Sequence, residues 1–348
     1  MFRHITDAQA LHKRTWFARH LRLFPGIGLS AVVAAAAALA TSQYGGPVFL
    51  YALLIGVALH HVSEEPRSAP GIEFCARTLL RLGVGLLGAR ITAQQIIQLG
   101  WSTALIVVVG VATTIGLAVF VGRRLRFSPA QSVLAGGAVA ICGASAALAI
   151  SAVLPKEKDG DRHTLMVVVS VTVMSTIAMV LYPLLSSGLG LQAQIAGVFI
   201  GGTIHDVAQV VGAGYTLGQE TGDVATVVKL FRVALLTVVV FLTALAFKRS
   251  KGQEASPDAK KSPPLVPWFL LLFIVMVGIN SFHFLPQVAV RGLSEMSQLL
   301  LILAVAALGL KTSFRELTNA GWRPIALIVI ETLWLAAIVL GLLYLRQR

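Results

Sequence analysis

Long apolar stretches are the feature that most constrains this chain. From Pro25 onward, runs of roughly 20 apolar residues recur with short polar breaks between them, a length that spans a bilayer when it is helical. Only 12% of the 348 residues are charged and 56% are hydrophobic, whereas a soluble globular protein carries about 25% charged residues. The sequence therefore predicts a multi-pass membrane protein that has the lipid bilayer as its main partner.

The length of these runs favours helices over a β-barrel. In lipid the backbone must satisfy its own hydrogen bonds, and the runs lack the ten-residue alternation of barrel strands. We expect an all-α membrane protein with about 11 transmembrane helices. The expected spans are residues 25–41, 47–62, 74–89, 102–122, 129–154, 164–186, 193–214, 224–247, 265–283, 293–310 and 323–345.

One polar linker divides the chain. Residues 248–264, rich in Pro and Lys, are expected to form a cytoplasmic loop between a first transmembrane part, 25–247, and a second, 265–348. Residues 1–24 are basic and contain several large apolar side chains, which favours a cytoplasmic or interfacial segment over a cleaved signal peptide. Because no segment is long enough for a soluble enzymatic domain, we expect the function to reside within the membrane.

The net charge of +13 is explained by membrane topology rather than by a nucleic-acid partner. If the N-terminus is cytoplasmic and the spans alternate, the cytoplasmic segments hold 17 Lys and Arg residues and the outer segments hold seven. This excess follows the positive-inside rule. Residues 156–163, KEKDGDRH, go against it, because their three basic side chains fall outside.

An internal repeat supports a transporter architecture. Residues 79–101 align without gaps to residues 300–322, with eight of 23 positions identical, including the closing Gly-Trp pairs. Seven expected spans separate the copies, so the copies would run in opposite directions. Inverted repeats are typical of secondary transporters, although chance similarity of leucine-rich helices is the alternative.

Two Gly-rich apolar segments are the candidates for interrupted helices. They are AGGAVAICGASAALAIS, residues 135–151, and GGTIHDVAQVVGAG, residues 201–214. An unwound Gly-rich backbone offers amide N–H groups and a positive helix end to an anion, whereas the alternative is that small residues only let helices pack closely. The candidate substrate-binding residues are Gly136, Gly137, Cys142, Gly143 and Ser145 in the first segment and Gly201, Gly202, Thr203 and Gln209 in the second.

The second segment also places ionisable groups deep in an apolar run. A charge at mid-membrane costs about 3 kcal/mol on insertion scales, so Asp206 must be neutralised, paired or hydrated. His205 and Asp206 both lie within helical reach of Gln209. We interpret His205 and Asp206 as ion-coupling residues for H⁺; Na⁺ held by Asp206, Gln209 and unwound carbonyls is the other ion considered. A pair that only ties helices together would also explain these residues. The spacing predicts no metal site and no cofactor.

Four basic residues fall within expected spans, as the pairs Arg77 and Arg81 and Lys229 and Arg232. The uncompensated positive charge favours a small anion as cargo. We expect Arg77 and Lys229 to extend to the headgroups, and Arg81 or Arg232 to supply charge to the substrate. Glu331 lies deeper in its span, and the sequence suggests no role for it.

At this point the chain can be compared with a known family. GGAVAICGASAALAISAVLP, GGTIHDVAQVVGAG and LLRLGVGLLGARIT resemble the YeiH-type sulfate exporter family of bacterial inner-membrane proteins over nearly the whole chain. That family is similar to the bile-acid/sodium symporter and arsenite-transporter clan, which implies inverted repeats with crossing broken helices. A single span between the two segments would leave them parallel, and a hairpin or deep break inside 129–154 would remove this conflict. The resemblance implies the bacterial cytoplasmic (inner) membrane, with sulfate or sulfite as the cargo.

The sequence thus predicts a secondary active transporter, not an enzyme, that exports a small inorganic sulfur oxyanion with H⁺ or Na⁺ coupling. A carrier of small organic acids or sulfonates is the nearest alternative. A passive anion channel is a further one, as is an intramembrane enzyme or sensor that uses His205 and Asp206. A homodimer is compatible with the sequence.

Overall fold

The computed structural model describes residues 22–63, 65–155, 157, 160–248, 267–312 and 321–347. Within these ranges all regular structure is helical and no strand occurs. The basic N-terminal segment and nearly all of the linker predicted at 248–264 lie outside the described residues. The chain forms two compact units, one of Met1–Gly83 with Glu295–Thr312 and one of Val84–Ser294 with Ser313–Arg348.

Closely packed helices form the first unit. Between α2 and α5 the close contact is made by Gly26 and Gly71, and a Cβ on Gly56 of α3 would lie 2.9 Å from the Cα of Gly309 in α16. Glycine at such contacts lets two helix backbones approach. The elements are α2 (Phe24–Tyr44), α3 (Val48–Ala58), α4 (His60–Ser63), α5 (Ala69–Phe74), the π-helical turn η1 (Cys75–Leu79) and part of α6 (Leu80–Leu87) and of α16 (Gln287–Lys311).

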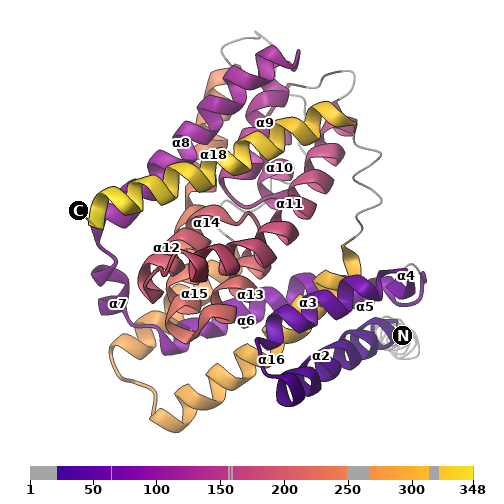
Figure 1. Cartoon of the computed structure of the whole chain (residues 1–348), viewed down its shortest axis with the longest axis vertical. Helices are drawn as coiled ribbons and strands as arrows, with labels where there is room; N and C mark the ends of the chain where they lie inside the picture. The colour runs from indigo at the N-terminus through magenta and orange to yellow at the C-terminus, as the bar shows by residue number, and fades with distance from the viewer. Residues whose placement is uncertain are drawn as a thin grey trace, which may run out of the picture. The chain divides into compact units, whose positions relative to one another are not determined.

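Long helices dominate the second unit, in which α8 and α18 lie side by side (Figure 1). Arg346 near the end of α18 donates to the Thr103 hydroxyl near the start of α8 at 2.8 Å, and Gly110 of α8 faces Leu335 of α18. The two helices are therefore antiparallel. The elements are η2 (Gly88–Arg90), α7 (Ala93–Gln98), α8 (Gly100–Arg124), α9 (Pro129–Ala140), α10 (Ala144–Ser151), α11 (Gly160–Gly188), α12 (Ala193–Thr203), α13 (Val207–Leu217), α14 (Gln219–Lys248), α15 (Trp268–Ser281) and α18 (Trp322–Gln347).

The all-helical prediction is confirmed for the described residues. In the part of the chain that the structure describes, six helices, α2, α8, α11, α14, α16 and α18, are long and apolar enough to cross a membrane, and shorter apolar helices include α3 and α15. The count of about 11 spans and the inverted repeat stay predictions. Gly100 and Gly321, which the repeat aligns, both have positive φ, 74° and 81°, directly at the starts of α8 and α18.

The span expected at 129–154 is a helical hairpin, hereafter hairpin 1. α9 ends at Ala140, Gly143 has φ +62°, and α10 then runs back along α9. A Cβ on Gly137 would meet the side chain of Ile150, although a continuous helix would separate these residues by about 20 Å. Glycine permits the positive φ that this reversal requires. Of the two alternatives for this segment, the hairpin is the one observed.

The span expected at 193–214 also folds back, as hairpin 2. Thr221 of α14 donates to the carbonyl of Ala193 at the start of α12, at 3.2 Å, and a Cβ on Gly214 near the end of α13 would lie 3.4 Å from the Thr221 carbonyl. Both ends of the 193–214 segment therefore lie beside Thr221. The linking residues Ile204 and Asp206 are extended. The expectation of crossing broken helices is wrong, because each of the two interrupted segments folds back on itself at its break.

The two hairpins meet tip to tip at the middle of α11. Hairpin 1 lies along the first half of α11, where His163 contacts the Gln131 carbonyl at 3.2 Å and a Cβ on Gly143 would lie 3.7 Å from Val171. Hairpin 2 lies along the second half. Its contacts are Ser175 with the Asp206 amide at 3.0 Å, Thr176 with Gln209 at 2.8 Å, and the rings of Tyr182 and Phe199 at 5.2 Å.

Candidate functional site

The guanidinium of Arg232 joins the two hairpin tips. It is fully buried and donates to the carbonyls of Val139 and Ala140 at the end of α9 and to those of Gly201 and Ile204 at the end of α12, at 2.7–3.1 Å. All five guanidinium N–H donors are thereby engaged. The positive charge meets the last carbonyls of both helices, which carry the negative end of the helix dipole.

Lys229, one turn earlier on α14, makes the second bridge. Its ammonium group is fully buried and donates to the carbonyls of Ile141, Ile204 and His205, so its three N–H donors are used as well. The expectation that Lys229 extends to the headgroups is wrong, because the carbonyl oxygens at both tips solvate it inside the protein. Sequence pattern could not identify these partners, since a backbone carbonyl has no residue-type signature.

His205 is fixed through both ring nitrogens. Nδ1 lies 3.1 Å from the carbonyl of Val139 in hairpin 1, and Nε2 lies 3.0 Å from the hydroxyl of Thr332 in α18. A carbonyl only accepts, so Nδ1 carries a proton, and in the neutral ring Nε2 accepts from Thr332. The imidazole is fully buried. It therefore couples hairpin 2 to hairpin 1 and to α18.

Asp206 caps α13 at its positive end. Its carboxylate accepts from the Ala208 amide at 2.8 Å, a bond that stabilises a helix N-terminus. Gln209, one turn further, is fully buried, and its Nε2 donates to Thr176. Its Oε1 has no hydrogen-bond partner among the described residues. The structure thus brings His205, Asp206 and Gln209 to one tip, as the sequence spacing predicts.

The glycines predicted to bind substrate divide into two groups. Gly143 lies at the tip of hairpin 1, where its added Cβ would lie 3.7 Å from His205. The others are contacts between helices: Gly136 faces Ala118 of α8, Gly201 faces α14 and Gly202 faces Val339 of α18. Gly137 packs on Ile150, as described above. Close packing is therefore the visible role of these four residues.

Polar side chains complete the tip of hairpin 1. Ser145, in the first turn of α10, is exposed, and its hydroxyl lies 3.1 Å from the carbonyl and 3.4 Å from the sulfur of Cys142. No side chain of the described residues caps the N-terminus of α10. Thr203 in hairpin 2 is buried and donates to the Phe199 carbonyl of its own helix. Ser145 is thus the polar candidate that the structure leaves accessible.

Charges at the two tips sum to a positive value. Lys229 and Arg232 contribute two positive charges and Asp206 one negative charge. The C-terminal ends of α9 and α12 each act as about −0.5 and the N-terminal ends of α10 and α13 as about +0.5, so the helix ends cancel and a net charge of about +1 remains. Such a site attracts an anion.

The other basic residues of the sequence prediction lie in the first unit. Arg77 and Lys311 both pair with Glu73, and the Arg77 side chain is 64% exposed. Arg81 on α6 is also exposed. From the sequence we expect Arg77 to reach the headgroups and Arg81 to supply charge to the substrate, but the two side chains do not differ in this way, because both are exposed.

Glu331, which has a buried carboxyl group, is a residue whose importance the sequence did not reveal. Glu331 is fully buried in α18, and neither carboxyl oxygen has a hydrogen-bond partner in the described part of the chain. It directly precedes Thr332, which bonds His205. Its depth within an apolar run was the available signal, but its lack of a hydrogen-bond partner among the residues described is visible only in three dimensions.

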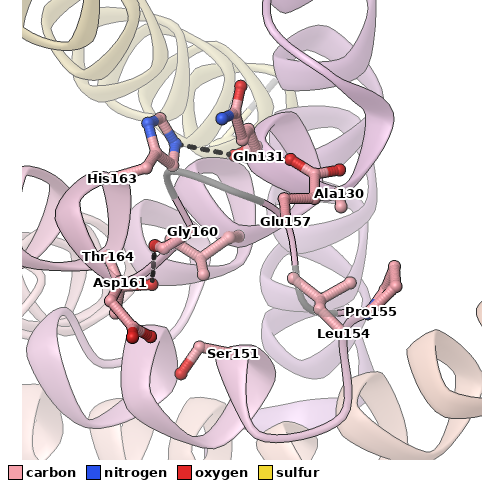
Figure 2. A pocket seen from close by; sticks show the side chains of 11 residues that line it. Ala130, Gln131, Ser151, Leu154, Pro155, Glu157, Gly160, Asp161, His163 and Thr164 are labelled. Atoms are coloured by element: carbon pink, nitrogen blue, oxygen red, sulfur yellow. Dashed lines mark hydrogen bonds between the residues drawn. The ribbon is translucent and has the colours of Figure 1, made fainter.

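Figure 2 shows a pocket at the base of hairpin 1, where Gln131, Glu157 and His163 face Ser151 and Asp161 across it. Its volume is about 210 Å³. α10 separates this pocket from the tips by about 12 Å. Two carboxyl groups make it a poor site for an anion. No cluster of His, Cys, Asp or Glu fit to hold a metal occurs in the residues that the structure describes.

Comparison with known proteins identifies the family. The family described as conserved hypothetical protein 698 matches residues 25–328. The chain is 49% identical to the UPF0324 membrane protein TauZ of Paracoccus pantotrophus over 92% of this chain and 95% of that one. It is 46% identical to a UPF0324 membrane protein of Chlorobaculum tepidum over 92% and 89% of the two chains. To the inner membrane protein YeiH of Escherichia coli K12 it is 33% identical, over 94% of each. The chain therefore belongs to the UPF0324 family of membrane proteins, which includes YeiH and TauZ.

Proposed function

We propose that this chain is a secondary active transporter that exports a small inorganic sulfur oxyanion, sulfate or sulfite, across the bacterial cytoplasmic membrane. The observation that carries the proposal is the meeting of two helical hairpins around Lys229 and Arg232 at the middle of α11. Because α11 is long enough to span a bilayer, hairpins on its two halves would enter from opposite sides and meet near the midplane. Secondary transporters bind substrate at this depth.

The hairpins also improve the agreement with the positive-inside rule. A hairpin that returns to its own side is not a span, so residues 156–163 move to the cytoplasmic side when the N-terminus is cytoplasmic. The three basic residues that opposed the rule then support it, and the cytoplasmic segments hold 20 of the Lys and Arg residues against four outside. The linker at 248–264 stays cytoplasmic in this arrangement.

The anion would bind at the N-terminus of α10. There the first turn of α10 offers backbone amides beside the exposed side chain of Ser145, at a helix end that no side chain of the described residues caps. The Gly143 amide itself donates to the Ala138 carbonyl at 2.8 Å, and the role of Gly143 is to turn the chain into this helix. Lys229 and Arg232 would contribute through their charge rather than by direct hydrogen bonds, because backbone carbonyls occupy all of their donors. A contribution from Arg81 stays a prediction.

Protons suit this site better as the coupling ion than sodium does. Sodium would need carbonyl oxygens at the unwound tips, and the carbonyls of residues 139–141, 201, 204 and 205 already accept hydrogen bonds from the two buried cations. An ammonium and a guanidinium group thus occupy the oxygen-lined space where an alkali ion would bind. The intramembrane enzyme has less support, because both nitrogens of His205 are engaged.

The test is uptake of radiolabelled sulfite and sulfate by proteoliposomes that contain the full chain, with pH and sodium gradients imposed separately and protein-free vesicles as background. Accumulation driven by a pH gradient and indifferent to sodium is the expected result. Flux that a small sulfonate inhibits more strongly than sulfite does would indicate an organic-anion carrier. The absence of flux under every gradient would overturn the proposal.

A further inference from the structure

The depth of Glu331 follows from the packing of α18. Its neighbour Thr332 bonds His205 at the tip of hairpin 2, and Val339, two turns along, faces Gly202 of α12. Glu331 therefore lies at the level of the two tips, at the tenth of the 26 residues of α18. In the membrane arrangement proposed above, this level is close to the midplane.

A second unsatisfied group lies at the same depth. Gly110 of α8 faces Leu335 of α18. Thr114 lies one turn after Gly110 and Glu331 one turn before Leu335, and because the helices are antiparallel both steps move about 6 Å in the same direction. The hydroxyl of Thr114 is fully buried and, like the Glu331 carboxyl, has no hydrogen-bond partner among the described residues. Buried polar groups without partners are rare and need an explanation.

No charged group in the described part of the chain pairs with Glu331 to compensate a carboxylate. The helices that pack against α18 are α8, α9, α11 and α12. Beyond the end of α12, His205 at the tip of hairpin 2 also contacts α18, through Thr332. No hydrogen bond or ion pair within the described residues joins Glu331 to any ionisable group on these elements or on α14. Those groups are Arg123 and Arg124 on α8, Asp161, Arg162, His163 and Tyr182 on α11, His205, and Glu220, Asp223, Lys229 and Arg232 in the part of α14 whose side chains are described.

From this geometry we infer that Glu331 carries the proton of the transport cycle, an inference that rests on the proposed function. An unpaired carboxylate at mid-membrane is costly, so the group is protonated in the conformation described. Movement of α18 against the tips would hydrate the carboxyl and release the proton. His205 and Asp206, which the sequence suggested for this role, instead have structural hydrogen bonds to Val139, Thr332 and the α13 backbone.

The charge balance sets the direction of coupling. With Glu331 protonated the tips hold a net charge of about +1, and with Glu331 ionised the sum is about zero. Protonation and anion binding therefore favour each other, and anion and proton cross in the same direction. A divalent anion that leaves with one proton still carries one negative charge outward, which an inside-negative membrane potential favours.

The transport experiment compares wild type with Glu331→Gln in proteoliposomes that contain the full chain, with Glu220→Gln, an exposed position at the start of α14, as the matched control. An acidic exterior should drive accumulation of labelled sulfite or sulfate in wild type and in the control. In Glu331→Gln this accumulation should be lost, whereas exchange of labelled for unlabelled anion should persist, because Gln mimics the protonated carboxyl. Retained accumulation in Glu331→Gln, or loss of exchange together with accumulation, would overturn the inference.

Infrared spectroscopy of the same proteins tests protonation without any cargo. Wild type and Glu220→Gln should show the C=O stretch of a protonated carboxyl at neutral pH, and Glu331→Gln should lack it. If wild type transports neither anion, the proposed function fails, and the infrared band alone decides whether Glu331 holds a proton. A band that is absent from wild type, or that survives in Glu331→Gln, contradicts the inference.

Discussion

Nη2 of Arg232 donates to the carbonyl of Ala140 at 2.7 Å, across 92 residues of sequence. This bond links α14 to the last residue of α9, and further bonds from the same guanidinium reach the end of α12. One side chain thereby neutralises the C-terminal ends of two half-helices inside an apolar protein. The stability of the tips should depend on the number of donors this side chain supplies.

Arg232→Lys should lower the free energy of unfolding by about 2–4 kcal/mol, because an ammonium group supplies three donors in place of five and leaves buried carbonyls unpaired. Thermal unfolding of the purified protein in detergent micelles measures the change. Arg123→Lys, at an exposed position at the end of α8, should change stability little. Equal effects of the two substitutions would show that the carbonyl bonds of Arg232 contribute nothing specific.

Lys229→Met should create a site that responds to sodium. The substitution removes the ammonium group and leaves the carbonyls of Ile141, Ile204 and His205 without its hydrogen bonds, and oxygen ligands of this kind suit a hard cation. Sodium chloride should therefore raise the melting temperature of Lys229→Met more than choline chloride does. In wild type the two salts should give the same melting temperature. The same response in both proteins would argue against an alkali-ion position at the ammonium group.

Asp206→Asn separates the capping role of this residue from proton coupling. Asparagine caps a helix about as well as aspartate, so the free energy of unfolding should change by less than about 1 kcal/mol. If Glu331 carries the proton, Asp206→Asn should keep accumulation driven by a pH gradient. If Asp206→Asn still exchanges labelled anion but no longer accumulates it, Asp206 and not Glu331 is the residue that carries the proton.

Gly136→Ala should destabilise the protein by about 1–3 kcal/mol, the usual cost of overpacking. The added methyl group would lie 2.5 Å from the Cβ of Ala118 and 3.1 Å from the Cα of Ile115, both on α8. Gly116→Ala is the matched control, because nothing lies within 4 Å of its added Cβ. Alanine there should be neutral or stabilising by up to about 1 kcal/mol, since it favours the helix. Melting curves of the two variants check the difference.

Glu331→Leu should raise the free energy of unfolding by about 1–2 kcal/mol while it abolishes coupling. The reason is that an apolar side chain of similar size replaces a buried carboxyl group that has no hydrogen-bond partner within the described ranges. Thermal unfolding in micelles is the readout, with Glu220→Leu as the control at an exposed position. A lower melting temperature for Glu331→Leu would indicate that the carboxyl has a stabilising role.

The sequence alone determined that the chain is helical and belongs in a membrane, since both follow from the length of its apolar runs. It also located the two interruptions, because Gly-rich stretches with polar side chains mark them, and it placed His205, Asp206 and Gln209 at one of them. These properties depend on residues close together in the chain, so composition and spacing are sufficient to predict them.

The tertiary structure alone decided that both interrupted segments fold back and that their tips meet. It also decided that Lys229 and Arg232 lie buried among backbone carbonyls and that Glu331 has no hydrogen-bond partner among the described residues. The physical reason is that these features depend on contacts between distant segments, and the acceptors are peptide carbonyls that every residue possesses. A charged side chain in an apolar run has the same local sequence whether it reaches the headgroups or caps two helices. Only the packing of α14 and α18 against the hairpins distinguishes these outcomes.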